Sequence, residues 1–197
     1  MIVYNGIICC ERDNELVPRH IAQLDSLGQP MQHCLYYGMD SKPRDDVPHH
    51  TVGLFETYEN FSCKVYSAFK HALQFPEWDV FVKSDVTSKV VEIRWDLVAV
   101  NDLVGWVTPI CGPYGNCQFN RAYALERYTE RAFAEPFTGK PPKYWIGGPC
   151  YVISRKLAKL AVDRGIWAWR GWQAEDVYIA KIAEDHGISP VNGVLCE

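Results

Sequence analysis

Apolar and polar positions along the chain follow two periods in turn, and these periods predict strands that alternate with helices. Residues 2–10 form an apolar run typical of a buried strand. Residues 13–28 then show helical spacing, with Pro18 in the expected first turn and Gly28 at the expected end. One face of this helix would carry Leu16, Val17, Ile21, Leu24 and Leu27.

The same succession continues through the first half of the sequence. Residues 32–37 predict a second strand, and residues 38–50 are rich in turn formers and predict a loop. Apolar positions at helical spacing predict a helix over 57–73. The short apolar run 78–83 is typical of a strand in the buried middle of a parallel sheet.

The second half gives a less uniform pattern. Residues 88–100 carry a helical stripe and a strand alternation at once, so both assignments stay open. Residues 103–110 predict a strand, and 112–143 a long polar and aromatic excursion over the sheet, partly helical around 120–133. The remaining elements are a strand at 151–154, a helix at 154–165 and a last helix at 174–187.

Strands alternating with helices predict an α/β fold with a mostly parallel central sheet and helices on both faces. The 197 residues, 48% of them hydrophobic, suit one domain over 1–197. The net charge of −4 disfavours an electrostatic binder of nucleic acid or membrane surfaces, although a local patch could still bind DNA. No stretch approaches the roughly 20 apolar residues of a membrane span.

Cysteine usage and the first residues bear on the compartment. The eight cysteines form no CxxC pair, which disfavours a zinc site, and most lie in strand-like apolar runs. The opening "MIVYNGIICC" predicts a strand rather than a signal peptide. On this interpretation we expect a cytoplasmic protein with all eight thiols free.

Candidate chemistry gathers where the predicted strands end. Ligands of parallel α/β sheets bind beyond the carboxyl ends of the strands. Acidic residues at a helix start are also common because they suit the helix dipole. The residues at these positions are Glu11, Arg12 and Asp13 after the first strand, Ser84 and Asp85 after the third, and Glu175 and Asp176 at the last helix.

Four motifs in order resemble the glycosyltransferases of the β-1,3-galactosyltransferase and Fringe group. "TYENFSCK" is similar to that family's Y-x-N-L-T-x-K helix, and "KSD" to its K-x-D-D-D strand end. "YWIGGPCYVIS" is similar to Y-x-S-G-G-G-Y-V-x-S, and "EDVY…GISP" to E-D-V-Y-x-G followed by L-G-I-x-P. The resemblance covers roughly residues 56–190 and implies a divergent, anchorless member with a GT-A fold.

The resemblance implies an inverting transfer from a nucleoside-diphosphate sugar, such as a UDP-sugar, to a hydroxyl of a glycan or another acceptor. Asp176 would be the catalytic base and Glu175 its substitute, because the family uses an acidic pair there. Trp145 and Trp172 would contact the acceptor, since aromatic faces suit sugar rings. The donor would be bound by Glu11, Arg12, Lys64, Lys83, Asp85, Gly147 and Gly148.

The metal motif departs from the family, because Val86 and Thr87 replace two of its three aspartates. A divalent ion (Mn²⁺ or Mg²⁺) can bind through one protein carboxylate together with the donor phosphates, so Asp85 alone could still serve. The other interpretation is metal-free, with a basic residue such as Lys83 or Lys64 meeting the diphosphate. Weak or optional metal use is the favoured hypothesis.

Two other functions stay open at this stage. One is sugar transfer onto modified bases of phage DNA, which the net negative charge disfavours. The other is an inactive sugar- or protein-binding module with the same fold, which the presence of both Glu175 and Asp176 disfavours.

Overall fold

The structure is a computed structural model that describes residues 1–57, 60–109, 142–170 and 175–197. The excursion predicted over 112–143 therefore lies, except for its last two residues, outside the described residues. The helix predicted over 57–73 is described from residue 60 onwards.

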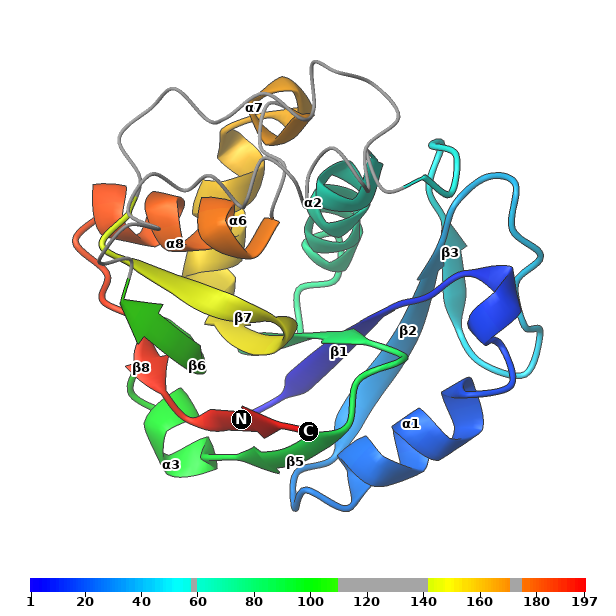
Figure 1. The fold of residues 1–197 in the computed structure, drawn as a ribbon, viewed down its shortest axis with the longest axis horizontal. Coiled ribbons are helices and arrows are strands. Elements are labelled where there is room, and N and C mark those ends of the chain that lie inside the picture. The colour runs from blue at the N-terminus through cyan, green and yellow to red at the C-terminus, as the bar shows by residue number, and fades with distance from the viewer. Residues whose placement is uncertain (58–59, 110–141, 171–174) are drawn as a thin grey trace.

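A seven-stranded sheet in the described part of the chain forms the centre of the molecule, in the order β3-β2-β1-β4-β7-β6-β8 (Figure 1). A second sheet pairs β5 with β9. The strands of the large sheet are β1 Val3–Ile8, β2 Met31–Tyr37, β3 His49–Thr51, β4 Val80–Asp85, β6 Leu103–Pro109, β7 Tyr144–Ser154 and β8 Val191–Asn192. Those of the small sheet are β5 Val90–Ile93 and β9 Val194–Cys196.

The large sheet is mostly parallel, as the sequence predicts. β1 is parallel to β2 and β4, β2 to β3, and β6 to β8. β7 runs antiparallel to both of its neighbours, β4 and β6. The expectation for β4 is therefore corrected: it is buried, but only one of its two neighbours is parallel.

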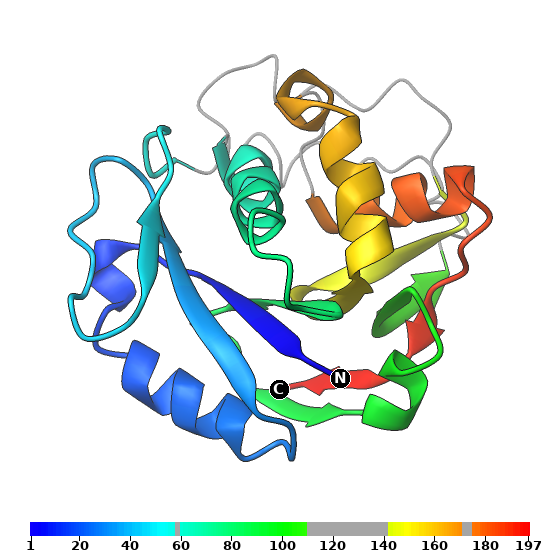
Figure 2. The same ribbon diagram turned by 180° about the vertical axis from the view of Figure 1, so that it is seen from behind.

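Helices cover both faces of this sheet, which confirms the predicted α/β class (Figures 1 and 2). One face carries α2 Phe61–Ala72, α6 Arg155–Asp163, α7 Ile166–Arg170 and α8 Glu175–Asp185. The other carries α1 Val17–Asp25, α3 Trp95–Val98 and the small sheet, while a short 3-10 turn, Glu11–Asp13, follows β1. None of the helices in the described ranges is long and apolar enough to cross a membrane.

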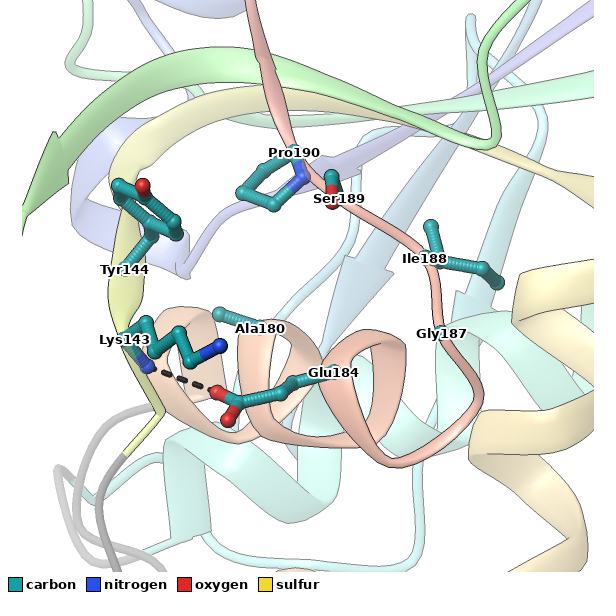
Figure 3. Close-up of a pocket in the computed structure, with 8 residues that line it drawn as sticks. All are labelled: Lys143, Tyr144, Ala180, Glu184, Gly187, Ile188, Ser189 and Pro190. Carbon is teal, nitrogen blue, oxygen red and sulfur yellow. Dashed lines mark hydrogen bonds between the residues drawn. The ribbon is translucent and has the colours of Figure 1, made fainter.

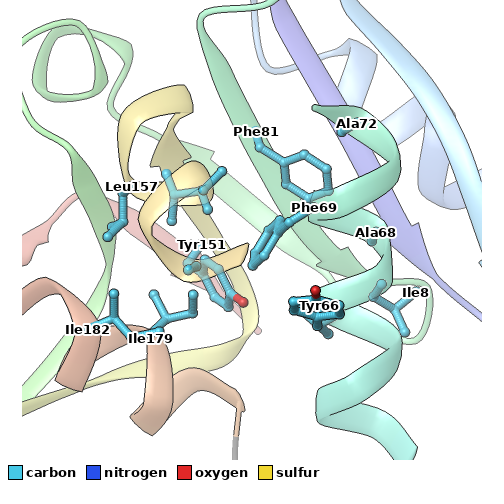
Figure 4. Close-up of a cluster of buried hydrophobic side chains, with 14 of the residues drawn as sticks. Ile8, Tyr66, Ala68, Phe69, Ala72, Phe81, Tyr151, Leu157, Ile179 and Ile182 are labelled. Carbon is cyan, nitrogen blue, oxygen red and sulfur yellow. The ribbon is translucent and has the colours of Figure 1, made fainter. Parts of the chain in front are cut away.

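Strand alternation divides the apolar side chains between two layers. Phe81 of β4 and Tyr151 of β7 point into the layer under α2, α6 and α8, where they pack near Phe69 (Figure 4). Val80 and Val82 face the opposite layer, which contains Leu24 of α1 and Val98 of α3. The period of two in a strand thus places alternate residues of β4 on opposite faces of the sheet.

Several elements differ from the sequence-based prediction. The stretch 88–100, for which helix and strand both stayed open, contains one of each, since the strand β5 is followed by the helix α3. β7 begins at Tyr144, well before the predicted strand at 151–154. The short strands β3, β8 and β9 were not predicted because two or three residues carry too little periodicity. One domain over 1–197 stays a prediction.

Cysteines in the described ranges are unbridged. Cys9, Cys10, Cys34, Cys63, Cys150 and Cys196 are free thiols. Cys111 and Cys117 lie outside the described residues.

Candidate active site

The carboxyl ends of β1 and β4 meet at one edge of the large sheet. Ile8, the last residue of β1, is in register with Asp85, the last residue of β4. Ser84 is in register with Cys150 on β7, so the glycines that precede Cys150 extend past the end of β4. The first turn of α8 packs on this segment, because an Oδ2 atom of Asp176 lies next to Gly148. Three sequence-predicted clusters therefore meet at this edge.

Lys83 lies at the centre of the site and has no exposed surface. Its ammonium nitrogen is 2.8 Å from Asp85 Oδ1 and 3.0 Å from Glu175 Oε1. It also donates a hydrogen bond to the carbonyl oxygen of Gly148, at 2.5 Å. The aromatic rings of Phe61 and Tyr151 lie 5.0 and 5.7 Å from the same nitrogen. One buried cation thus joins β4, β7 and α8.

The two carboxylates decide the charge state of this lysine. Burial alone would lower the pKa of Lys83, but the neighbouring charges of Asp85 and Glu175 raise it above its usual value. Desolvation raises the pKa of Asp85 to about 6, while the Lys83 charge acts to lower it. A quarter of the Asp85 side chain is exposed, against 6% of that of Glu175. Asp85 is therefore the partner of Lys83 that can reach a ligand.

Asp176 differs from both in making no ion pair with a described residue. Its Oδ1 accepts a hydrogen bond from the backbone N–H of Val177, at 2.8 Å. Burial and the neighbouring charge of Glu175 raise the pKa of Asp176 to about 8. A carboxyl group with this pKa can hold or release a proton near neutral pH, which suits a general base.

Gly147 and Gly148 lie in an irregular part of β7. Gly105 pairs with Tyr151 and Val107 with Ile146, so the β7 segment 147–150 lies opposite Trp106 alone. A Cβ atom at Gly148 would lie 3.0 Å from Asp176 Oδ2, and one at Gly147 would lie 3.3 Å from the Trp106 side chain. The missing side chains thus allow α8 and Trp106 to approach the backbone. Approach of a bound sugar to these glycines stays a prediction.

Three buried polar atoms at the site have no hydrogen-bond partner among the described residues: Asp85 Oδ1, Glu175 Oε1 and the Tyr151 hydroxyl. The two carboxylate atoms are nevertheless ion-paired with the Lys83 ammonium, at 2.8 and 3.0 Å. Tyr151 is fully buried, and burial followed by the charge of Glu175 raises its pKa. The Tyr151 hydroxyl, by contrast, has neither an ion-pair nor a hydrogen-bond partner among the described residues. An unpartnered buried polar group is costly, which favours a site that a ligand completes.

The other predicted donor residues lie along the same edge but outside this cluster. Lys64 is buried and donates to the carbonyl oxygen of Cys9 and to a carboxylate oxygen of Glu56. Glu11 accepts a hydrogen bond from the backbone N–H of Lys42, at 3.0 Å. Arg12 is mostly exposed, with its Nε 3.8 Å from Asp13. Glu11 and Arg12 follow β1, next to the end of β4, whereas Lys64 belongs to α2 and reaches the residue Cys9 just after β1.

The aromatic candidates divide between described and undescribed parts of the chain. Trp145 is partly buried on β7, where it pairs with Thr108. Trp172 lies outside the described residues. Sequence reasoning missed Trp106, which lies on β6 against Gly147 and is 60% exposed. Its only sequence signal was a large aromatic residue in an otherwise small and apolar strand.

A small cavity of about 160 Å³ lies away from this cluster, at the far end of α8 (Figure 3). Lys143, Tyr144 and Glu184 line it, and the Lys143 backbone N–H donates to Glu184 Oε2 at 2.7 Å. Glu184 follows Asp176 by eight residues, or roughly 12 Å of helix. This cavity therefore does not belong to the candidate active site.

The carboxylates of the described residues are too few to hold a metal ion by themselves. In the described ranges, no group of three or more His, Cys, Asp or Glu side chains is arranged to hold a metal ion. Val86 is buried and cannot ligate, and Asp85 Oδ1 faces the Lys83 ammonium. A metal held jointly by Asp85 and donor phosphates stays an expectation.

Comparison with known proteins shows which solved structures have a similar fold. The sequence matches no protein-family model and no curated protein. Among solved structures, the chain is similar to the galactosyltransferase LgtC in complex with donor and acceptor sugar analogs. The two share 10% sequence identity with a TM-score of 0.53, over 96% of this chain and 72% of LgtC. The fold is therefore GT-A-like, whereas membership of the Fringe-like group stays a prediction.

Proposed function

We propose that the protein is an inverting glycosyltransferase that moves a sugar from a nucleoside-diphosphate sugar to an acceptor hydroxyl. The observation that carries this proposal is the buried Lys83 between Asp85 and Glu175, at the carboxyl edge of a GT-A-like sheet. Next to it lies Asp176, which has no ion-pair partner among the described residues and a raised pKa. The acceptor would be a glycan or another hydroxyl compound, and a UDP-sugar is the donor that we would test first.

Asp176 is the residue best suited to take the acceptor proton. The acceptor oxygen would attack the anomeric carbon as its proton passes to Asp176, and the bond from that carbon to the diphosphate would break. Glu175 is held by Lys83, 3.0 Å from its ammonium, whereas Asp176 has no such partner among the described residues. This difference supports Asp176 over Glu175 as the base.

Lys83 would act on the donor through the electrostatic effect of its positive charge rather than by direct contact, since none of its surface is exposed. Its positive charge lies 2.8 Å from Asp85, the partly exposed carboxylate at the end of β4. Asp85 would then contact a hydroxyl of the sugar or ribose. A buried positive charge also offsets the negative charge that develops on the leaving diphosphate.

Donor binding tests both the function and the metal hypothesis. We expect one nucleoside-diphosphate sugar in a thermal-shift screen to raise the melting temperature. Chelation with EDTA should lower transfer only partially, whereas Asp85→Ala should weaken donor binding, measured by calorimetry, more than EDTA does. The reason is that Lys83 already offsets charge at Asp85.

Two results would contradict these expectations. Failure of every nucleoside-diphosphate sugar to bind would refute the proposed function. Binding that disappears in EDTA and returns fully with Mn²⁺ would show a complete metal site, whose further ligands could be Glu11 or Asp13.

For the acceptor, the exposed face of Trp106 is a candidate stacking surface. Indole faces suit the apolar faces of sugar rings, and Gly147 leaves this indole room beside the site. Trp106→Ala should raise the acceptor KM about fivefold, since a stacking contact contributes on the order of 1 kcal/mol, with donor affinity unchanged. The matched control is Trp167→Ala on α7, another strongly exposed indole. An effect of Trp167→Ala alone would instead locate the acceptor near α7.

A further inference from the structure

The strand that carries Lys83 and Asp85 is held from its opposite face by α1. Side chains alternate along β4, so Lys83 contacts α8 through Glu175, whereas Ser84 points to the α1 side. There it meets His20, a residue of α1 with only 2% of its surface exposed.

The His20 ring bridges two points that enclose the turn after β4. Its Nε2 lies 3.0 Å from Ser84 Oγ, and its Nδ1 lies 3.2 Å from the carbonyl oxygen of Ser88. Between these two contacts, the Ser88 N–H donates to the Asp85 carbonyl oxygen at 2.9 Å. The Val86 N–H donates to the Ile8 carbonyl oxygen at 3.2 Å. The ring therefore spans residues 84–88, including Asp85.

The partners of the ring assign one neutral tautomer to His20. The carbonyl oxygen of Ser88 can only accept, so Nδ1 carries the proton, and Nε2 accepts from the Ser84 hydroxyl. Ser84 Oγ accepts in turn from Asn5 Nδ2 at 3.2 Å, and this amide also donates to the Val82 carbonyl oxygen at 3.0 Å. Burial lowers the pKa of His20 to about 4, which keeps the ring neutral near pH 7. Each hydrogen-bond donor in this network of His20, Ser84 and Asn5 therefore has an acceptor.

We propose that His20 is a positioning residue for the donor site: its two ring nitrogens clamp the turn 84–88 and thereby hold Asp85 in place against Lys83. This inference rests on the proposed function for its catalytic consequence, but the clamp itself is independent of any ligand. Misplacing a binding group by about 1 Å can cost on the order of a hundredfold in rate.

Two variants each keep one end of the clamp. In His20→Asn the amide nitrogen can take the place of Nδ1 and keep the Ser88 contact, and in His20→Gln the amide can take the place of Nε2 and keep the Ser84 contact. His33→Gln is the matched control. His33 belongs to the same hydrogen-bond network, with Nδ1 3.0 Å from Asn5 Oδ1 and Nε2 2.9 Å from Asp25 Oδ1. Among the described residues, these partners lie outside the turn 84–88.

The first measurement is hydrogen exchange of the Val86 and Ser88 amides in the ligand-free protein. We expect exchange to rise about tenfold in both His20 variants, the size expected for losing one buried hydrogen bond, and to stay unchanged in His33→Gln. The second is kcat/KM for the donor, which should fall about 10- to 100-fold in the His20 variants. Melting temperatures establish that every variant is folded.

The outcomes separate the clamp from the proposed function. Unchanged exchange in both His20 variants would overturn the clamp. Raised exchange with unchanged kcat/KM would overturn its role in positioning Asp85. The third outcome combines two results: exchange rises in the His20 variants, but the wild-type protein binds no nucleoside-diphosphate sugar. This outcome would support the clamp and refute the proposed function.

Discussion

Asp176→Asn is expected to lower kcat by about 10²–10⁴-fold while leaving donor affinity nearly unchanged, because the variant loses the general base but keeps its shape. Asp176 is buried beside Gly148, and its carboxyl group is free of ion pairs with described residues. Steady-state transfer rates together with donor calorimetry measure the two effects separately. A variant that keeps more than about half of the wild-type turnover would show that the assignment is wrong.

The pH dependence provides an independent check on the same residue. The base must be ionised, and burial raises the pKa of Asp176 to about 8. The kcat/KM of the wild type should therefore rise as pH increases through about 8, since this ratio reports groups of the free enzyme. Glu175→Gln is the matched variant. If it alone abolishes transfer and Asp176→Asn does not, Glu175 is the base.

Lys83→Met is expected to destabilise the folded protein by about 3–5 kcal/mol at pH 8, the cost typical of removing one partner from a buried ion pair. The change leaves Asp85 and Glu175 at a buried site without their shared cation. For a chain of this size, such a loss corresponds to a fall in melting temperature of roughly 6–20 °C. Chemical denaturation and thermal melting both measure it.

The sign of the pH effect distinguishes charge from packing in this variant. Burial already raises the pKa of Asp85 to about 6, and the Lys83 charge acts to lower it. Without this cation, the pKa of Asp85 in the folded state should rise further above its value in the unfolded chain. Groups raised in this way stabilise the fold less as pH increases, so the destabilisation should be larger at pH 8 than at pH 5. A pH-independent loss would point to packing alone.

Lys89→Met is the control, because Lys89 pairs with Glu197 at the surface, where both side chains are more than half exposed. Such pairs contribute about 0–1 kcal/mol. A similar loss in both variants would contradict a special role for the buried lysine.

The amino-acid sequence alone was sufficient to predict the main elements of the fold. β1, α1, β2, α2 and α8 each carry an apolar periodicity over several residues, and that periodicity follows from burying one face of an element. The positive φ of Gly28, 87°, likewise agrees with its predicted place after α1. The same patterns were insufficient for β3 and β8, which pair only because neighbouring strands are already in place.

The sequence was sufficient to predict which residues belong to the candidate site, but not which of them contact one another. Acidic residues at strand ends and at the start of the last helix marked Asp85, Glu175 and Asp176, because the carboxyl edge of a parallel sheet is where ligands bind. Their different roles depend on contacts between distant segments. Lys83 is 92 residues before Glu175 in the chain, and only the packing of α8 on β7 brings this carboxylate to the lysine. The same packing leaves Asp176 without an ion-pair partner among the described residues.

Tertiary structure alone also decided the roles of His20 and Trp106. A histidine in an amphipathic helix and a tryptophan in a strand have no sequence signal that separates function from packing. His20 became significant because α1 crosses beneath Ser84 and Ser88, whose oxygens lie within hydrogen-bond distance of its ring. Trp106 became significant because Gly147, on the neighbouring strand, has no side chain to cover it. Sequence periodicity reports which face of an element is buried, whereas the partners on that face are chosen by the packing of the whole chain.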